Sequence, residues 1–440
     1  MQTHDFVRFL DGSVSSFHAA QLTAARLAER GFRQLELRDS WNISSGDRVY
    51  VEHGGSVVAI RVGRATPAES GAIIAAAHTD SPSPQLKPRS ATVADGLLQV
   101  PVEVYGGPIL ATWLDRELGV AGRIVAVDGE GTPRVHQVAI RRAMAVIPNL
   151  AIHLNREVND GVSYNRQDHL RAVFGPAANP PDGDPESDEN SPTPEQQLYD
   201  RIADAAGVDA DTIVDTELYL VPTAPATVLG GDDGLVVSPR IDNLAGCYAV
   251  AEAIAAADPS ADHTQVAVFF NHEEIGSATS VGAAGALLES VLRRVVAALD
   301  VAPDAWDRTV ARSVLLSNDA AHARHPNYPE KHDPGYAPRL GGGPVVKKSA
   351  IWRYVADLDI SGWFAAVCRD AEVPLQYLQN RSDIRAGSTI GPAVAARLGV
   401  RGVDIGIPML AMHSVRETAA VADVANMIVA LTRAYGSSLP

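Results

Sequence analysis

FFNHEEIGSATSVG, residues 269–282, joins a run of strand-forming residues to a turn rich in glycine and hydroxyl side chains. The apolar residues that lead into it are typical of a buried strand, and a helical pattern follows the turn. Glu273 and Glu274 therefore lie next to each other where a buried strand is expected to end. Two adjacent carboxylates repel each other, so this position indicates that a compensating cation lies nearby.

Strand and helix patterns alternate from about residue 234 to the end of the chain. Helical patterns are found at 243–257, 281–299, 360–371, 390–399 and 421–435, and strand patterns at 265–270, 313–317 and 375–379. Earlier, 15–32 has a helical pattern and 56–62 that of a strand. The run at 71–78 is apolar throughout before its final histidine, as expected of a strand covered on both faces. This alternation predicts an α/β fold: a mostly parallel sheet with helices on both faces.

The middle of the chain has a different texture. Short β-type runs with glycine punctuation extend from about residue 98 to 146. We interpret 175–197, which is rich in proline and acid, as a mobile surface loop, because little in it could pack. A chain of 440 residues also exceeds the usual size of a single core. We therefore predict an α/β domain at 1–84 and 235–440, interrupted by an inserted β-rich domain at 85–234.

Composition and charge argue against several classes of function. The chain has 46% apolar and 20% charged residues, as ordinary globular proteins do, and a formal net charge of −16. That charge argues against a nucleic-acid partner, because phosphates need cations to neutralise them. The chain shows no signal-peptide pattern, no apolar run of membrane-spanning length and two cysteines, too few for a disulfide framework. We expect a soluble cytoplasmic protein without membrane contact.

Residue types that bind metals occur where the predicted strands end. Ligands of open α/β sheets bind beyond the carboxyl ends of the strands, so these side chains are expected to meet. The candidates are His78, Asp80, Asp242, Glu273, Glu274, Asp319, His322, His413 and Glu417. Each alone has an ordinary explanation, such as a helix N-cap, a dipole interaction or a hydrogen-bonded core histidine. However, at least five strand ends of one sheet are predicted to carry them, and packing does not require that pattern.

A pair of divalent ions explains the two adjacent glutamates. Two ions about 3.5 to 4 Å apart need a carboxylate between them and further nitrogen and oxygen ligands on each side. One glutamate can then bind a metal while its neighbour stays free as a base toward water. The residues therefore indicate a dinuclear metal site.

Several longer motifs carry a resemblance to a known family. They are HTDSP (78–82), SPRIDNLAG (238–246), NHEEIGS (271–277), SNDAAHARHPNYPEKHDP (317–334), GSTIGP (387–392) and MHSVRE (412–417). In order and wording these closely resemble the M18 aspartyl aminopeptidases, from the amino-terminal helix to the end of the chain. The resemblance implies a two-zinc peptidase domain with an inserted dimerisation domain, and dimers that assemble into a tetrahedral particle of twelve subunits.

The resemblance also implies which residues hold the metals. Carried onto matching positions, Asp242 would bridge the two ions. His78 and Asp319 would complete the protein ligands of one ion, and Glu274 with His413 those of the other. Zinc is the expected metal, two ions per subunit, with Mn²⁺ or Co²⁺ as substitutes.

Further roles follow from the same resemblance. Glu273 would be the general base, and Asp80 would orient a histidine ligand. His153, in IPNLAIHL, matches a histidine that reaches a neighbouring subunit's active site. His322 and Lys347 match positions of the substrate pocket. A buried lysine would explain a preference for peptides that begin with Asp or Glu.

The expected reaction is removal of one residue from the free amino end of a peptide. The nearest alternative is another dinuclear hydrolase reaction on the same fold, by a carboxypeptidase or a deacylase. A more distant alternative is a non-enzymatic structural or cargo protein. Loss of ligands would be its sign, and every ligand position is filled in this chain. The family often has a histidine where this chain has Asn149, which we take as a tolerated difference.

Overall fold

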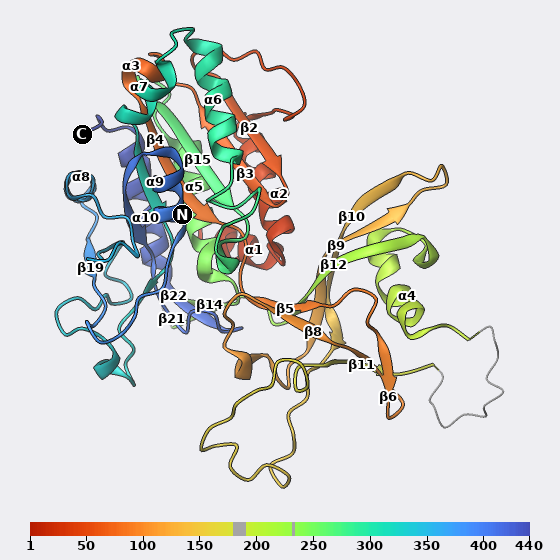
Figure 1. Cartoon of the computed structure of the whole chain (residues 1–440). Helices are drawn as coiled ribbons and strands as arrows, with labels where there is room; N and C mark the ends of the chain where they lie inside the picture. The colour runs from red at the N-terminus through yellow and green to blue at the C-terminus, as the bar shows by residue number, and fades with distance from the viewer. Residues whose placement is uncertain (179–190, 231–233) are drawn as a thin grey trace. The chain divides into compact units, whose positions relative to one another are not determined.

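The computed structural model describes residues 1–178, 191–230 and 234–440. Contacts between residues divide the described chain into two units (Figure 1). Unit 1 comprises Met1–Ser81, Ala226–Met412 and Arg416–Pro440, and unit 2 comprises Pro82–Pro225 and His413–Val415. The sequence placed the boundaries of the insertion after residues 84 and 234, and its role in dimerisation stays a prediction.

Unit 1 is built on a nine-stranded sheet with the order β1-β2-β3-β15-β4-β16-β20-β18-β19. These strands are β1 (Arg33–Gln34), β2 (Arg48–His53), β3 (Ser56–Arg61), β15 (Thr264–Phe270), β4 (Ala72–His78), β16 (Val314–Asn318), β20 (Arg401–Gly406), β18 (Val345–Lys347) and β19 (Gln376–Leu378). The four central strands, β15, β4, β16 and β20, run parallel, whereas β3 and β18 on either side of them are antiparallel to their inner neighbours. The predicted α/β class is confirmed, and the sheet is mixed toward its edges.

Helices cover both faces of this sheet, as the apolar central strands require (Figure 1). Every residue of β4 is buried, and its alternate side chains enter two different cores. Ile73 and Ala75 pack in the core that contains α5 and α10, whereas Ile74 and Ala76 pack in the core that contains α6 and α9. The helices of unit 1 are α1 (Thr3–Gly12), α2 (Ser16–Glu29), α3 (Pro67–Ser70), α5 (Ile241–Ala256), α6 (Leu287–Leu299), α7 (Ala305–Arg312), α8 (Leu358–Asp370), α9 (Ile390–Leu398) and α10 (Val421–Tyr435).

A second sheet of unit 1 carries other predicted site residues. Its order is β13-β14-β22-β21-β17, with β13 (Thr227–Leu229), β14 (Leu235–Ser238), β22 (Glu417–Ala420), β21 (Pro408–Leu410) and β17 (Ala321–His322). Asp242 follows β14, and His413 follows β21. The expectation that at least five such ends belong to one sheet is therefore wrong, since the two sheets share them.

Unit 2 is rich in antiparallel strands. One sheet has the order β10-β9-β12-β5-β8 and another the order β11-β7-β6. The strands are β5 (Ser83–Leu86), β6 (Thr92–Ala94), β7 (Leu97–Val100), β8 (Val102–Tyr105), β9 (Leu118–Val127), β10 (Pro133–Ala145), β11 (Ala172–Pro176) and β12 (Ile213–Pro222). Helix α4 (Pro194–Ala206) packs on them and begins with a capping box, in which Thr193 accepts a hydrogen bond from the Gln196 N–H.

Two local predictions differ from the structure. The helix predicted at 281–299 begins only at Leu287, because Gly282 and Gly285 lie in turns where a Cβ atom would approach a carbonyl oxygen to 2.3 Å. Most of the loop predicted at 175–197 lies at 179–190, outside the described residues. Its first two residues belong to β11 and its last four to α4.

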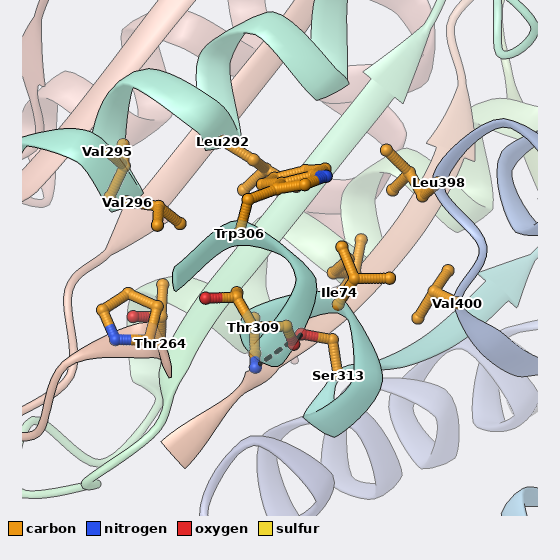
Figure 2. A pocket seen from close by; sticks show the side chains of 13 residues that line it. Ile74, Thr264, Leu292, Val295, Val296, Trp306, Thr309, Ser313, Leu398 and Val400 are labelled. Atoms are coloured by element: carbon orange, nitrogen blue, oxygen red, sulfur yellow. Dashed lines mark hydrogen bonds between the residues drawn. The ribbon is translucent and has the colours of Figure 1, made fainter. Parts of the chain in front are cut away.

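A small apolar cavity lies between α6, α7 and β4 (Figure 2). Trp306 and Leu292 form part of its wall, and its volume is about 20 Å³. That is room for about one water molecule, and an apolar cavity of this size stays dry. We interpret it as a packing gap without a ligand. Among the helices of the described chain, none has the length and apolar character needed to cross a membrane.

Candidate metal centre

The turn after β15 places Glu273 and Glu274 at the carboxyl end of the central sheet. His272 has a left-handed backbone with φ 65°, and a short 3₁₀ turn, Glu273–Ile275, follows and ends at Gly276 with φ 95°. Asn271 fixes the entry to this turn, because its Oδ1 accepts from the His272 N–H (3.0 Å) and its Nδ2 donates to the Gly54 carbonyl (3.0 Å). The chain therefore turns sharply after β15, and this turn brings Glu273 and Glu274 close to His78 at the end of β4.

Asp80 holds this turn through two backbone hydrogen bonds. Its Oδ1 accepts from the Glu273 N–H at 3.0 Å, and its Oδ2 accepts from the Glu274 N–H at 3.1 Å. Asp80 is also close to His78, since the His78 Nδ1 lies 3.1 Å from the Asp80 backbone oxygen and 3.6 Å from its Oδ1. Asp80 lies beside His78 as expected, with its backbone oxygen nearer than its carboxylate, and its role in orienting this histidine stays a prediction. Its two hydrogen bonds to the backbone of the glutamates are a feature that sequence reasoning missed.

His78, Asp242 and Asp319 form a buried group of potential metal ligands. The His78 Nε2 lies 3.4 Å from the Asp242 Oδ1 and 3.7 Å from the Asp319 Oδ2. With Nδ1 toward the Asp80 oxygens, Nε2 is the nitrogen that faces these carboxylates. His78, Glu273 and Glu274 make a second such group, and in each group one ligand atom per residue lies within 4.8 Å of the others.

Asp242 is held from both sides of its own backbone. Its N–H donates to the Glu417 Oε2 at 3.0 Å, and its carbonyl accepts from the Ser81 hydroxyl at 2.7 Å. Asp242 lies in the first turn of α5 with non-helical φ and ψ, so it is not a simple N-cap. Glu417 was a sequence candidate without an assigned role, and the structure shows it as a buried anchor of Asp242.

Lys347 contacts the other oxygen of Asp319. Its Nζ donates to the Asp319 Oδ1 at 2.9 Å, lies 5.3 Å from the ring centre of Tyr354, and its side chain is only 2% exposed. Burial disfavours the ammonium form, but Asp319 outweighs this and raises the pKa of Lys347. The lysine therefore stays charged. Tyr354 carried no sequence signal.

The remaining predicted residues occupy different places. His322 lies on β17 and is exposed. His413 belongs to unit 2, where its Nδ1 lies 2.9 Å from the Gly107 carbonyl, which leaves its Nε2 as the nitrogen able to bind a metal.

His153 lies in an exposed turn of unit 2. Asn149, in the same loop, donates through its N–H and its Nδ2 to Asp115, at 2.8 Å each.

The electrostatics of the centre favour a bound cation. Burial, together with the nearby carboxylates of Asp319, Asp80 and Asp242, raises the pKa of Glu273 to about 8. Burial disfavours the imidazolium of His78, but hydrogen bonds to Asp242 and Asp80 outweigh this and raise its pKa well above the usual value. Clustered carboxylates with imidazole nitrogen are a donor set that zinc accepts. The arrangement can therefore hold zinc and keep one carboxylate beside it.

Comparisons with known proteins give a consistent family. The family model "Aminopeptidase I zinc metalloprotease (M18)" matches residues 9–435. "Probable M18 family aminopeptidase 2" of Pseudomonas aeruginosa (strain UCBPP-PA14) is 42% identical over 433 residues, which cover 98% of this chain and 97% of the relative. The protein of the same name from Stutzerimonas stutzeri (strain A1501) is 40% identical over 433 residues, with the same coverage.

Solved structures of the same architecture are similar over almost the whole chain. A cryo-EM structure of the Ape4 and Nbr1 complex has a TM-score of 0.93 at 33% identity, and the match covers 98% of this chain and 85% of that one. An M18 aminopeptidase from Thermotoga maritima has a TM-score of 0.84 at 22% identity, covering 99% and 95%. A dodecamer of mApe1 from S. cerevisiae has a TM-score of 0.83 at 24% identity, covering 98% and 95%. The last two likenesses concern the fold alone.

Proposed function

Since the chain belongs to the M18 family of zinc aminopeptidases, which are hydrolases, we propose that it releases amino-terminal residues, preferably Asp and Glu, from peptides. The observation that carries this proposal is the position of Glu273. Its carboxylate stands beside a buried group of His and Asp ligands, and the Asp80 hydrogen bond fixes its backbone. A group that exchanges protons near neutral pH at such a place is suited to general base catalysis.

Two zinc ions are proposed to occupy the centre, with Mn²⁺ or Co²⁺ as substitutes. His78 and Asp319 would hold one ion and Glu274 with His413 the other, and Asp242 would lie between them. The imidazole nitrogens and carboxylate oxygens fit zinc, and the grouping of His78 with Asp242 and Asp319 supports this assignment. When bound, the ions supply Lewis-acid activation of water and of the scissile carbonyl.

The remaining catalytic work is assigned to side chains of this protein. Glu273 takes the proton of the attacking water and passes it to the amine that leaves, so one carboxylate serves as base and then as acid. Asp80 keeps Glu273 in reach by holding its N–H. His322, on the strand that follows Asp319, is proposed to contact the substrate.

Lys347 is proposed to give the acidic preference. An ammonium group has three N–H donors, and Asp319 uses one of them, so two remain for a substrate carboxylate. A neutral substrate side chain would leave these donors unpaired in a buried place, which is costly. The lysine would then stabilise both the ligand Asp319 and the first residue of the peptide.

The assembly is proposed to be a homo-oligomer, with dimers that build a dodecamer. His153 would then reach the active site of a neighbouring subunit, which its exposed turn permits. A solved relative is a dodecamer, and that supports the proposal. Both cysteines, Cys247 and Cys368, are buried and unpaired, which supports a reducing compartment such as the cytoplasm.

A peptide panel tests the reaction class. Peptides blocked at the amino end, blocked at the carboxyl end, or free at both ends separate an aminopeptidase from a carboxypeptidase or a deacylase. We expect cleavage only where the amino end is free, with higher kcat/KM for Asp or Glu than for Leu or Ala. An enzyme that prefers leucyl peptides would refute the acidic preference and leave the aminopeptidase reaction in place.

Two substitutions test the division of roles between the glutamates. Glu273→Gln is expected to keep the wild-type metal content and to lose about 10²- to 10⁴-fold in kcat, the usual contribution of positioned proton transfer. Glu274→Gln is expected to lose both metal and activity. The check is metal analysis of the purified variants. If Glu273→Gln loses metal and Glu274→Gln keeps it, the two proposed roles are wrong as assigned.

A further inference from the structure

Unit 1 contains a cavity of about 130 Å³. Its wall is formed by His322, Lys331, His332, Asp333, Tyr336, Leu378, Gln379, Asn380, Arg381, Ile384 and Arg385. These residues come from two segments, 322–336 and 378–385. The cavity has the volume of a small polar group or a short side chain, so it is large enough for a ligand group, unlike the apolar gap of Figure 2.

Two residues of the cavity wall, His322 and Leu378, lie close in the chain or in the sheet to proposed site residues. His322 follows Asp319 by three residues, so their Cα atoms lie no more than about 10 Å apart. Leu378 is the register partner of Lys347 in the pairing of β18 with β19, and the Lys348 N–H donates to its carbonyl at 2.9 Å. The cavity therefore borders the segments that carry both Asp319 and Lys347.

The cavity is positively charged in a strongly acidic protein. Lys331, Arg381 and Arg385 contribute cations to its wall, whereas the whole chain carries a net charge of −16. Asp383 pairs with Arg381, so Lys331 and Arg385 remain against the single carboxylate of Asp333 in the wall. Within the described residues, the side chains of Lys331 and Arg385 form no ion pair. A local excess of cations that other side chains do not neutralise is suited to an anionic ligand.

Two other members of the wall are fixed in place and can donate. Arg381 is held by two hydrogen bonds to Asp383 (2.9 and 2.8 Å) and one to the Glu330 carbonyl (2.9 Å). The His332 Nε2 accepts from the His325 N–H at 3.0 Å, so its proton lies on Nδ1. Burial, with the nearby side chains of His325 and Arg324, lowers the pKa of His332 and keeps this ring neutral.

We propose that this cavity is a subsite for a second carboxylate of the peptide substrate, besides that of the first residue's side chain. The inference rests on the proposed aminopeptidase function and names a further part of its substrate. Lys347 is buried and already bound to Asp319, so its remaining donors serve one carboxylate at most. The cations of the cavity are separate from Lys347 and are suited to a second carboxylate. That carboxylate is either the terminal carboxylate of a dipeptide or the side chain of an acidic second residue.

Three peptides test the proposal and distinguish the two sources. They are Asp-Ala, Asp-Ala amide and Asp-Asp amide, and kcat/KM is measured for each with the full-length, metal-loaded protein. We expect wild type to favour Asp-Ala, Asp-Asp amide or both over Asp-Ala amide by about tenfold, the value of one charged hydrogen bond. The free dipeptide alone would identify the terminal carboxylate, and Asp-Asp amide alone the side chain.

Substitutions assign the preference to the cavity. In Arg385→Gln and Lys331→Gln the preference ratio is expected to fall toward one, and Arg385→Lys is expected to restore most of it. Arg312→Gln, in an exposed last turn of α7, is the matched control for loss of one positive charge and should keep the ratio. Thermal melting confirms that each variant is folded.

Binding gives a readout without turnover. Titration of Asp-Ala amide, and of the peptide that wild type favours over it, into metal-loaded Glu273→Gln protein should show the same tenfold preference in Kd. The Glu273→Gln, Arg385→Gln double variant should lack that preference. Equal treatment of all three peptides by wild type, or an unchanged ratio in both glutamine variants, overturns the subsite. Failure to release aspartate from any of the three peptides overturns the proposed acidic preference and the subsite with it.

Discussion

Replacement of Asp80 by asparagine tests how the turn that carries Glu273 and Glu274 is held. The two side chains have nearly the same shape, but asparagine has one acceptor oxygen where aspartate has two. The carboxylate now accepts from the Glu273 N–H at 3.0 Å and from the Glu274 N–H at 3.1 Å. In Asp80→Asn one of these bonds is lost, and an NH₂ group faces an N–H donor in a buried place.

The magnitude follows from these two contacts. A hydrogen bond to a charged group contributes about 1.5–3 kcal/mol, and a buried donor left without an acceptor costs about 1–3 kcal/mol. We take about 2–4 kcal/mol as the free energy that disfavours the native turn. If it must be supplied to place Glu273 in the transition state, kcat/KM falls roughly 30- to 700-fold, since about 1.4 kcal/mol is tenfold.

The assay is steady-state kinetics on an aspartyl peptide together with metal analysis. The metal content on the His78 side is expected to persist, because the closest oxygen to its Nδ1 is the Asp80 backbone carbonyl at 3.1 Å, which the substitution keeps. Asp128→Asn is the control, since this partly exposed aspartate also accepts two backbone hydrogen bonds but through a single oxygen, Oδ1. Activity within about twofold of wild type would refute the argument. If Asp80→Asn instead loses metal while the turn keeps its structure, the Asp80 carboxylate acts by orienting His78.

Three further outcomes are expected. Mixing His153→Ala with Glu273→Gln subunits should restore part of the activity after verified subunit exchange, because some mixed sites would contain both native groups; no recovery would count against a shared site. Lys347→Met should lose the preference for acidic over neutral peptides and also part of the metal held by Asp319, whereas a retained preference would place recognition elsewhere. Burial raises the pKa of Asp423 from 3.8 to about 6, so its contribution to folding stability is full below pH 4 and is lost as pH rises to 6. In urea unfolding, the stability of Asp423→Asn relative to wild type should therefore rise by about 3 kcal/mol from well below pH 4 to well above pH 6, and a pH-independent difference would contradict this.

Local sequence patterns predicted much of the architecture. The strands β3, β4, β15 and β16 and the helices α5, α9 and α10 lie where apolar periodicity indicated, because each buries a run with its own period. The start of α6 was wrong, since Gly282 and Gly285 fit turns that bring backbone atoms too close for any side chain. Periodicity describes a run of residues and says little about such single contacts.

The candidate ligands could also be found from sequence, but the groups that hold them could not. Asp80 grips a turn almost two hundred residues away, Glu417 holds the Asp242 N–H, and Lys347 binds the second oxygen of Asp319. In each pair the residue that supports the ligand lies on a different strand or loop, and local spacing contains no information about such a partner.

The supporting contacts differ in which part of each carboxylate residue they hold, and this difference bears on the chemistry of the centre. Asp80 spends its two oxygens on backbone N–H groups, and Asp319 gives one oxygen to Lys347, so each carboxylate is oriented before any cation arrives. The Asp80 carboxylate supports Glu273 through its backbone N–H. Burial, together with the nearby carboxylates of Asp319, Asp80 and Asp242, raises the pKa of the Glu273 side chain to about 8, although His78 opposes this. A buried carboxylate with a raised pKa stays basic near neutral pH, which suits the proton transfer proposed for Glu273. The proposed division between ligands and base thus follows from what each carboxylate contacts, although all of these residues carry the same functional group.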